Sequence, residues 1–282
     1  MKRRNLGVAS SGEIYRSTSS RRYKNTITDE NTFTIPTSKF RTVTPDLEEN
    51  TVLKSTTNET PVELKQDISE SNVELIIDGN SVDKTKKIIK YFKKKVKFIN
   101  NKNDKGLYHA MNVGIKNSKG DIIGILNSDD IYFKNTLKIV NKYFNKNKNL
   151  DFLFGSVHKY KLLYGYKPWK INFSFGFYST HSVGFFIKKN AHKKIGLYNL
   201  NYKYSADYDL FLRMIIKHKL NGMSTKKKEI FGKFRKGGFS SRIKFIDYLR
   251  ECNRIRINNG QNYLLVYFIF LIRCIKGINK II

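Results

Sequence analysis

The chain has 282 residues, and its 54 Lys and Arg against 23 Asp and Glu give a formal net charge of +31 at neutral pH. A hydrophobic content of 40% with only four prolines supplies a sizeable core and excludes wholesale disorder and collagen-like sequence. Two cysteines are too few for a disulfide framework or a cysteine-based metal site, which favours a reducing compartment.

The first 70 residues are nearly neutral, rich in Ser and Thr, and contain only four aromatic side chains. We therefore expect residues 1–71 to form a poorly ordered extension that contains at most a degenerate first strand. Residues 33–36 and 40–44 are the two candidates for that strand, and both are short and polar. Almost all of the positive charge and most of the aromatic residues follow this segment.

From residue 73 onward, apolar runs alternate with amphipathic stretches, which predicts an α/β fold around a mostly parallel sheet. Residues 121–127 are continuously apolar apart from their ends, as in a central strand buried on both faces. The other expected elements are strands at 73–77, 96–99, 151–157 and 183–187, and helices at 83–92, 108–116, 135–144 and 206–218.

The C-terminal segment, residues 243–282, predicts a basic helical tail after the main domain. A basic helix is expected from Ser241 to about Ile257, and an aliphatic run with Arg273 and Lys276 follows it. That run either lies on a membrane surface or packs on the domain. At about half the length that a bilayer crossing needs, it does not predict a membrane span, and the N-terminus lacks the apolar core of a secretion signal. We expect a cytoplasmic protein, peripheral on the inner membrane face if its positive surface meets anionic lipid.

Two of the expected strands end in acidic turns, and ligands of open α/β sheets bind beyond the carboxyl ends of strands. Asp78 begins one turn, and Asp129 and Asp130 lie in the other. Adjacent carboxylates repel one another unless a cation or a donor lies between them, and Mg²⁺ or Mn²⁺ prefers such oxygen ligands together with substrate phosphates. The alternative for the second turn is a helix N-cap.

Between those turns lies the string NDKGLYHAMNVGIKNSKGDIIGILNSDD, residues 103–130, which resembles family 2 glycosyltransferases of the GT-A fold. Further matches are the first acidic turn, the strand around His181, the start of the helix at residue 206, and a glycine loop near residue 237. Five motifs occur in the family's order over residues 72–242, which is far more specific than one motif. The family's first strand is the part without a recognisable match.

The resemblance implies a site for a nucleotide-sugar donor of the UDP or GDP type, with Mn²⁺ or Mg²⁺ held by Asp129 and Asp130. It also implies that Asp207 is the general base of an inverting transfer to a glycan, a lipid-linked or a protein acceptor, with Asp209 as the rival carboxylate. The implied substrate-binding positions are Asp78, Ser81, Asp83, Asp104, Gly106, Asn112, Asp130, His181, Arg235, Gly237 and Gly238.

Several of these positions have structural alternatives. His181 is more simply a buried, hydrogen-bonded histidine, and the two glycines are either a phosphate cradle or a turn. Trp169 either stacks on a sugar ring or belongs to the core. For the whole chain, the alternatives to an enzyme are an inactive GT-A-fold binding module and a basic nucleic-acid-binding protein. No nucleic-acid recognition motif is present, so no specific nucleic-acid partner is expected.

Overall fold

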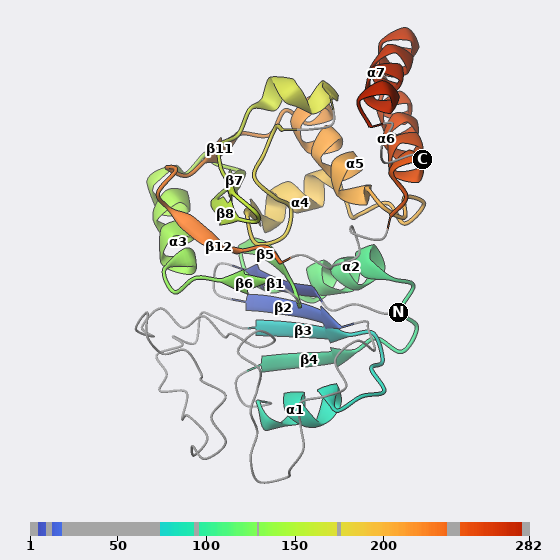
Figure 1. Ribbon diagram of the computed structural model, residues 1–282. Coiled ribbons are helices and arrows are strands. Elements are labelled where there is room, and N and C mark those ends of the chain that lie inside the picture. Colours follow the sequence, from blue (N-terminus) through green and yellow to red (C-terminus); the bar gives the residue numbers. More distant parts are fainter. Residues whose placement is uncertain are drawn as a thin grey trace.

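The computed structural model describes residues 5–9, 13–18, 74–92, 96–128, 130–173, 176–235 and 243–277. Within these ranges, two β-sheets are flanked by helices, and the expected α/β fold is confirmed (Figure 1). The proposed division of the chain at residues 71 and 242 stays a prediction.

The larger sheet has eight strands. Their order is β11 (Gly222–Ser224), β7 (Phe152–Phe154), β10 (Phe185–Lys188), β5 (Ile122–Asn127), β1 (Asn5–Ala9), β2 (Glu13–Thr18), β3 (Glu74–Asp78) and β4 (Val96–Asn100). Strands β2, β3 and β4 run parallel, whereas β10 is antiparallel to both of its neighbours and β1 is antiparallel to β2 and β5. Strand β5 is parallel to β2, β7 runs with β5 because both are antiparallel to β10, and β11 is parallel to β7. Six of the eight strands therefore run in one direction, with β1 and β10 reversed, and the expected mostly parallel sheet is confirmed. A short connection such as that between β1 and β2 joins only antiparallel strands.

Strands β1 and β2 lie in the segment for which we expected a poorly ordered extension. Their backbones fill the position between β5 and β3, with Leu6 opposite Leu126 and Arg16 opposite Ile76. The two stretches that were candidates for the first strand, residues 33–36 and 40–44, lie outside the described residues.

The smaller sheet has four strands, in the order β6 (Ile131–Tyr132), β12 (Ile230–Lys233), β8 (Ser156–His158) and β9 (Leu162–Leu163). The single strand expected at residues 151–157 is divided at Gly155, where the chain passes from the larger sheet into the smaller one. A Cβ atom on Gly155 would lie 2.1 Å from a ring carbon of Phe231, so only glycine lets β12 approach this crossing.

The helices are α1 (Thr85–Tyr91), α2 (Leu107–Asn117), α3 (Thr136–Lys146), α4 (Lys189–Ile195), α5 (Ala206–Leu212), α6 (Phe245–Asn258) and α7 (Tyr263–Lys276), with a 3₁₀ turn at Pro168–Phe173. The helix expected at residues 206–218 is α-helical only to Leu212 and continues as a π-helical turn, Arg213–Lys217. None of the helices in the described part of the chain has both the length and the apolar character that a bilayer crossing requires.

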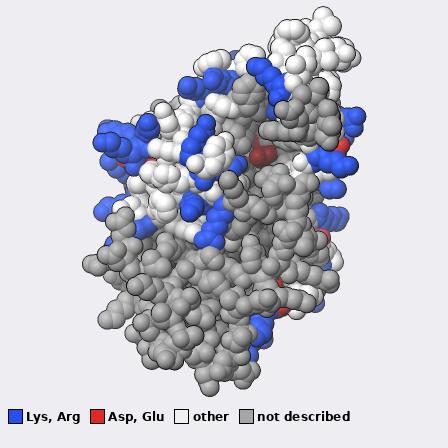
Figure 2. Space-filling view, in the orientation of Figure 1, with Lys and Arg blue, Asp and Glu red and all other residues white. Residues whose placement is uncertain are grey.

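Aromatic side chains form the centre of the larger hydrophobic core. The Phe154 ring centroid lies 5.3 Å from that of Phe185 and 5.7 Å from that of Phe211. Cys252 and Ile255 belong to the same buried cluster, so α6 packs into the core that supports α5. Figure 2 shows that most of the charged side chains on the described part of this face are Lys and Arg, in keeping with the high net charge.

Candidate active site

Asp207 lies in the first turn of α5 and is partly exposed. Its Oδ1 atom lies 3.0 Å from Oη of Tyr108, on α2, and the same hydroxyl oxygen lies 3.0 Å from the carbonyl oxygen of Tyr204. Burial, together with the Asp207 carboxylate, raises the pKa of Tyr108 well above its usual value. The hydroxyl therefore stays protonated and acts as a donor at this carboxylate.

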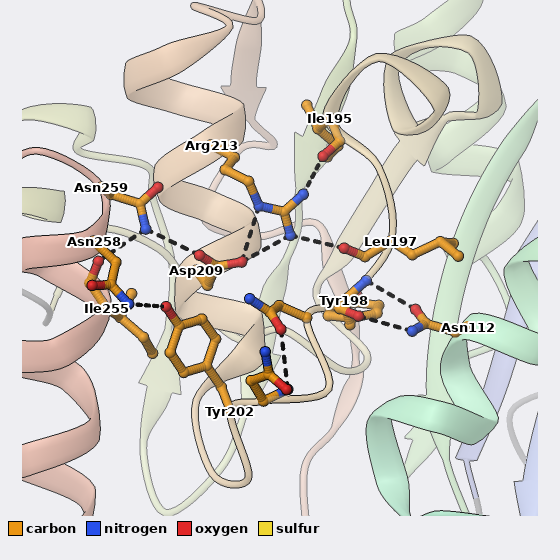
Figure 3. Close-up of polar contacts among 12 residues, drawn as sticks. Asn112, Ile195, Leu197, Tyr198, Tyr202, Asp209, Arg213, Ile255, Asn258 and Asn259 are labelled. Atoms are coloured by element: carbon orange, nitrogen blue, oxygen red, sulfur yellow. Dashed lines mark hydrogen bonds and ion pairs between the residues drawn. The ribbon is translucent and has the colours of Figure 1, made fainter.

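Asp209, the rival carboxylate on the same helix, is buried, and both of its oxygens accept hydrogen bonds. Its Oδ2 atom accepts hydrogen bonds from Nε and a terminal nitrogen of Arg213, each at 2.9 Å, and its Oδ1 atom accepts one from Asn259 at 3.0 Å (Figure 3). A buried carboxylate in such an ion pair is a structural group. Of the two carboxylates, Asp207 is the more exposed.

The chain entering α5 is anchored by Glu251, a buried residue of α6 that the sequence analysis did not select. Its carboxylate accepts hydrogen bonds from the backbone N–H groups of Lys203, Tyr204 and Ser205, at 2.7, 2.6 and 2.7 Å. These residues directly precede α5, so the carboxylate fixes the chain where it enters the helix and lies at the positive end of the helix dipole. No spacing in the sequence indicates this contact, because it joins two separate helices.

The segment between α4 and α5 is fastened from two sides (Figure 3). Arg213 donates to the carbonyl oxygens of Ile195 and Leu197. The side chain of Asn112, on α2, donates to the carbonyl oxygen of Tyr198 and accepts from its N–H group, both at 2.9 Å. Both ends of the Asn112 amide thus hold the backbone of Tyr198, whereas the resemblance had implied a place for Asn112 in the nucleotide pocket.

His181 is buried, and its Nε2 atom lies 2.6 Å from the hydroxyl of Tyr198. Burial lowers the pKa of His181, although the nearby Asp207 carboxylate partly opposes this effect. The Tyr198 ring in turn packs against that of Tyr108 at a centroid distance of 5.5 Å. The histidine is therefore a hydrogen-bonded core residue that borders the surroundings of Asp207.

Asp130 follows β5 and is 5% exposed. Its Oδ2 atom accepts a hydrogen bond from the Ser182 hydroxyl at 2.6 Å, and its Oδ1 atom accepts one from the backbone N–H of Arg235 at 3.0 Å. The Ser182 hydroxyl also accepts from the N–H of Asn127, at 3.0 Å. These contacts fix the end of β5 against the turn before β10, which carries His181 and Ser182. Asp129 lies outside the described residues, as do Gly237 and Gly238.

The first acidic turn is closed by its own side chains. Asp78, fully buried at the end of β3, accepts hydrogen bonds from the hydroxyl of Ser81 at 2.6 Å and from its N–H at 3.1 Å. Asp83 accepts one from the N–H of Thr85 at 2.9 Å, at the start of α1. Ser81 and Asp83 thus set the shape of the turn around Asp78.

The loop before α2 carries two further predicted positions. Asp104 accepts hydrogen bonds from the N–H of Gly106 at 3.1 Å and from the side chain of Asn101 at 3.3 Å. Gly106 has a φ angle of 115°, a conformation that favours glycine, and it directly precedes the helix. These contacts bring Asp104 to the same end of α2 that carries Tyr108.

The end of β5 offers oxygen donors to a cation. The side-chain oxygen of Asn127 is buried and has no hydrogen-bond partner among the described residues, and the carboxylate of Asp130 follows three positions later. Carboxylate and amide oxygens suit Mg²⁺ or Mn²⁺ and not a thiophilic metal. Within the described residues, no group of three or more His, Cys, Asp or Glu side chains forms a metal cluster. The Asn127 and Asp130 oxygens fit a hard divalent ion.

Trp169 lies in the 3₁₀ turn and is 65% exposed. It is therefore not a core residue. Its indole has edge-to-face contact with the Phe173 ring, and Lys170 lies over it.

Comparisons with known proteins match this chain to glycosyltransferases. A family model described as glycosyl transferase family 2 matches residues 59–216, more than half of the chain. An uncharacterized glycosyltransferase of Rickettsia typhi is 31% identical over 51% of this chain and 50% of its own length. The Escherichia coli protein named UDP-Glc:alpha-D-GlcNAc-diphosphoundecaprenol beta-1,3-glucosyltransferase WfgD is 33% identical over 29% of this chain and 32% of its own. The chain spans about half the length of the first of these relatives.

Among solved structures, residues 1–349 of S. aureus TarS in complex with UDP-GlcNAc align with a TM-score of 0.53 and 16% identity. The alignment covers 73% of this chain and 64% of the other. The same S. aureus protein in a second crystal structure gives a TM-score of 0.51. At this identity the likeness shows a shared fold.

Proposed function

This chain belongs to glycosyl transferase family 2, and from that membership we propose that it transfers a sugar from a nucleotide-sugar donor to an acceptor hydroxyl with inversion at the anomeric carbon. The acceptor is a glycan, a lipid-linked or a protein hydroxyl. The names of two similar proteins mention UDP-glucose and UDP-GlcNAc, which supports a UDP-linked donor as the first to test and a GDP-linked one as the second.

The observation that carries the proposal is a continuous set of contacts between Asp130 and Asp207. Asp130 binds Ser182, whose neighbour His181 binds the Tyr198 hydroxyl. The Tyr198 ring packs on that of Tyr108, and the Tyr108 hydroxyl binds Asp207. The carboxylate proposed for the donor side and the one proposed for the acceptor side therefore belong to one packed framework. Inverting transfer needs both, because attack and departure occur at one carbon.

On the acceptor side, Asp207 takes the proton of the acceptor hydroxyl while that oxygen attacks the anomeric carbon and the nucleoside diphosphate leaves. The Tyr108 hydroxyl holds one carboxylate oxygen at 3.0 Å, which leaves the other oxygen to receive the proton. Asp209 is unsuited to this role because Arg213 and Asn259 occupy its oxygens.

On the donor side, we propose that Asp78 contacts the nucleoside and that Asp129 and Asp130 hold Mn²⁺ or Mg²⁺. When bound, the ion neutralises charge that develops on the leaving diphosphate. Asp130 is fixed by Ser182 and by the backbone of Arg235, and the side chain of Arg235 supplies a further positive charge to the diphosphate. Gly237 and Gly238 complete the proposed donor site through their backbone N–H groups, and Ser81, Asp83, Asp104 and Gly106 shape its walls.

A thermal-shift screen of nucleoside diphosphates with Mn²⁺ or with a chelator tests the donor site, because a ligand that binds only the folded protein raises its Tm. We expect UDP or GDP to raise the Tm with Mn²⁺ and to lose that effect with the chelator or in Asp129→Ala. A metal-dependent shift without sugar turnover would identify an inactive binding module. The absence of any shift across the panel would contradict the proposed donor site.

A further inference from the structure

One face of α7 is apolar and open to solvent along its whole length. The stripe, defined as Leu264, Tyr267, Phe268, Leu271 and Ile275, follows helical spacing and contains no charged residue. Leu264 and Ile275, at its two ends, are 73% and 72% exposed, and Phe268, between them, is 61% exposed. In Figure 2, uncharged side chains at the α7 end form a projection beyond the rest of the described surface.

Within the described part of the chain, the domain does not cover this stripe. Helix α7 packs on α6 through the opposite face, where Val266 and Ile269 are buried and Arg273 lies over the Tyr248 ring. The helix begins with a side-chain cap, because Asn262 accepts a hydrogen bond from the N–H of Leu265 at 3.1 Å. The stripe therefore lies on a helix that is already formed. Binding a partner through it costs little conformational entropy.

Charge distinguishes between the possible occupants of the stripe. Exposed cations lie on the same two helices, with Lys276 at the end of α7 and Arg250 and Arg254 on α6. The two arginines make long contacts of 3.9 Å with Asp247 and Glu251 of their own helix, which leaves their outer faces to solvent. A second copy of the chain would bring another net charge of +31 and would be repelled, whereas a surface of anionic headgroups would be attracted.

We propose that the stripe on α7 docks the protein on an anionic lipid bilayer, with the helix lying in the interface. With 14 residues the helix is roughly 21 Å long, shorter than the hydrocarbon layer, so it lies along the surface instead of crossing it. Leucine, isoleucine and phenylalanine enter the acyl boundary, and Tyr267 lies at headgroup level, where tyrosine is favoured. This inference does not depend on the proposed transferase activity.

Flotation of the full-length protein with lipid vesicles tests the proposal. Vesicles of phosphatidylcholine with about one-third phosphatidylglycerol should bind it, and pure phosphatidylcholine vesicles should bind it more weakly. At ~0.5 M salt, where exposed charges are screened, the remaining binding should fall at least about tenfold in a Leu264→Ser, Phe268→Ser double variant.

Tyr91→Ser is the matched control, because Tyr91 is 62% exposed on α1, at the other end of the molecule (Figure 1). It should bind vesicles as the unaltered chain does. Because the substituted side chains are exposed, all variants should keep the Tm of the unaltered protein. Equal vesicle binding by the double variant would overturn the proposal. A dimer in sedimentation that the double variant dissociates, without vesicle binding, would overturn it in favour of a second copy.

Discussion

Tyr108 Oη lies 3.0 Å from Oδ1 of Asp207, although 99 positions of the chain separate the two residues. The contact joins α2 to the first turn of α5 and orients the carboxylate that we propose as the general base. The Tyr108 hydroxyl is therefore a positioning group. A substitution that removes only this hydroxyl keeps the packing of the ring on Tyr198.

Tyr108→Phe should therefore lower kcat more than donor affinity. The loss of a hydrogen bond to a charged group corresponds to roughly 1.5–3 kcal/mol, or about 10- to 150-fold in rate. Steady-state kinetics and donor titration on the same protein would separate the two effects. Tyr166→Phe is the control, because the Tyr166 ring packs in the same aromatic cluster against Phe152 and Phe154. Equal rates for both variants would remove Tyr108 from the mechanism.

Glu251→Gln should destabilise the start of α5. Oε1 of the carboxylate accepts two of the three backbone hydrogen bonds and Oε2 accepts the third, whereas glutamine has one accepting oxygen and its NH₂ group would face a backbone N–H. We therefore expect the free energy of unfolding to fall by about 2–4 kcal/mol. Urea denaturation measures this change. Asp247→Asn on the same helix should change it by less than about 0.5 kcal/mol, because its ion pair with Arg250 is long, at 3.9 Å, and exposed. Similar values for the two variants would show that the Glu251 contacts contribute little.

Asn112→Ala distinguishes a structural role of Asn112 from a place in the donor pocket. The substitution removes both hydrogen bonds to the Tyr198 backbone, so we expect the free energy of unfolding to fall by about 1–3 kcal/mol. Donor affinity of the folded protein should stay unchanged in a calorimetric titration. Weaker donor binding at unchanged stability would instead place Asn112 in the pocket, as the family resemblance implied.

His192 should make the protein less stable in mild acid. Burial lowers the pKa of this residue to about 4, while the unfolded chain binds the proton near pH 6.5. The unfolded state therefore binds more protons between these values, and stability falls as the pH falls from about 6.5 to 4, by about 3 kcal/mol in total.

Urea midpoints measured across that pH range test the effect of His192. His192→Leu should make the dependence shallower, leaving the contribution of His181, whose pKa burial also lowers. His218→Leu, at an exposed position, is the control substitution. A His192→Leu profile as steep as that of the unaltered chain would assign the acid sensitivity to other groups.

Much of the α/β core could be predicted from the sequence, because its elements are long enough to show a period. The buried strand β5 and helix α2 lie within one residue of their expected bounds. Short elements were missed, since the two residues of β6 or β9 carry no period at all. The division of one expected strand at Gly155 depends on the position of the Phe231 ring, which no local pattern contains.

The candidate site residues were predicted from motifs, which specify residue types and positions but not the contacts between side chains. The motif assigned the general base to Asp207, with Asp209 as its rival. Burial of Asp209 and its contacts with Arg213 and Asn259 distinguish the two in the structure. Glu251 could not be found from the sequence, because a carboxylate on a basic helix looks like an ordinary surface residue until its helix is docked. For Asn112, the motif implied a place in the nucleotide pocket, whereas in the structure its side chain is hydrogen-bonded to the backbone of Tyr198. Such contacts arise between elements distant in the chain.

The most direct test of the proposed transferase chemistry compares the unaltered chain with Asp207→Asn. The substrate is the nucleotide sugar that the thermal-shift screen identifies, with water or added glycans as acceptor. The measured quantity is the rate at which nucleoside diphosphate is released. Loss of a general base predicts a rate lower by about 10²- to 10⁴-fold, with donor affinity and Tm unchanged. A variant that turns over the donor as fast as the unaltered chain would contradict the assignment of Asp207 and the inverting mechanism built on it.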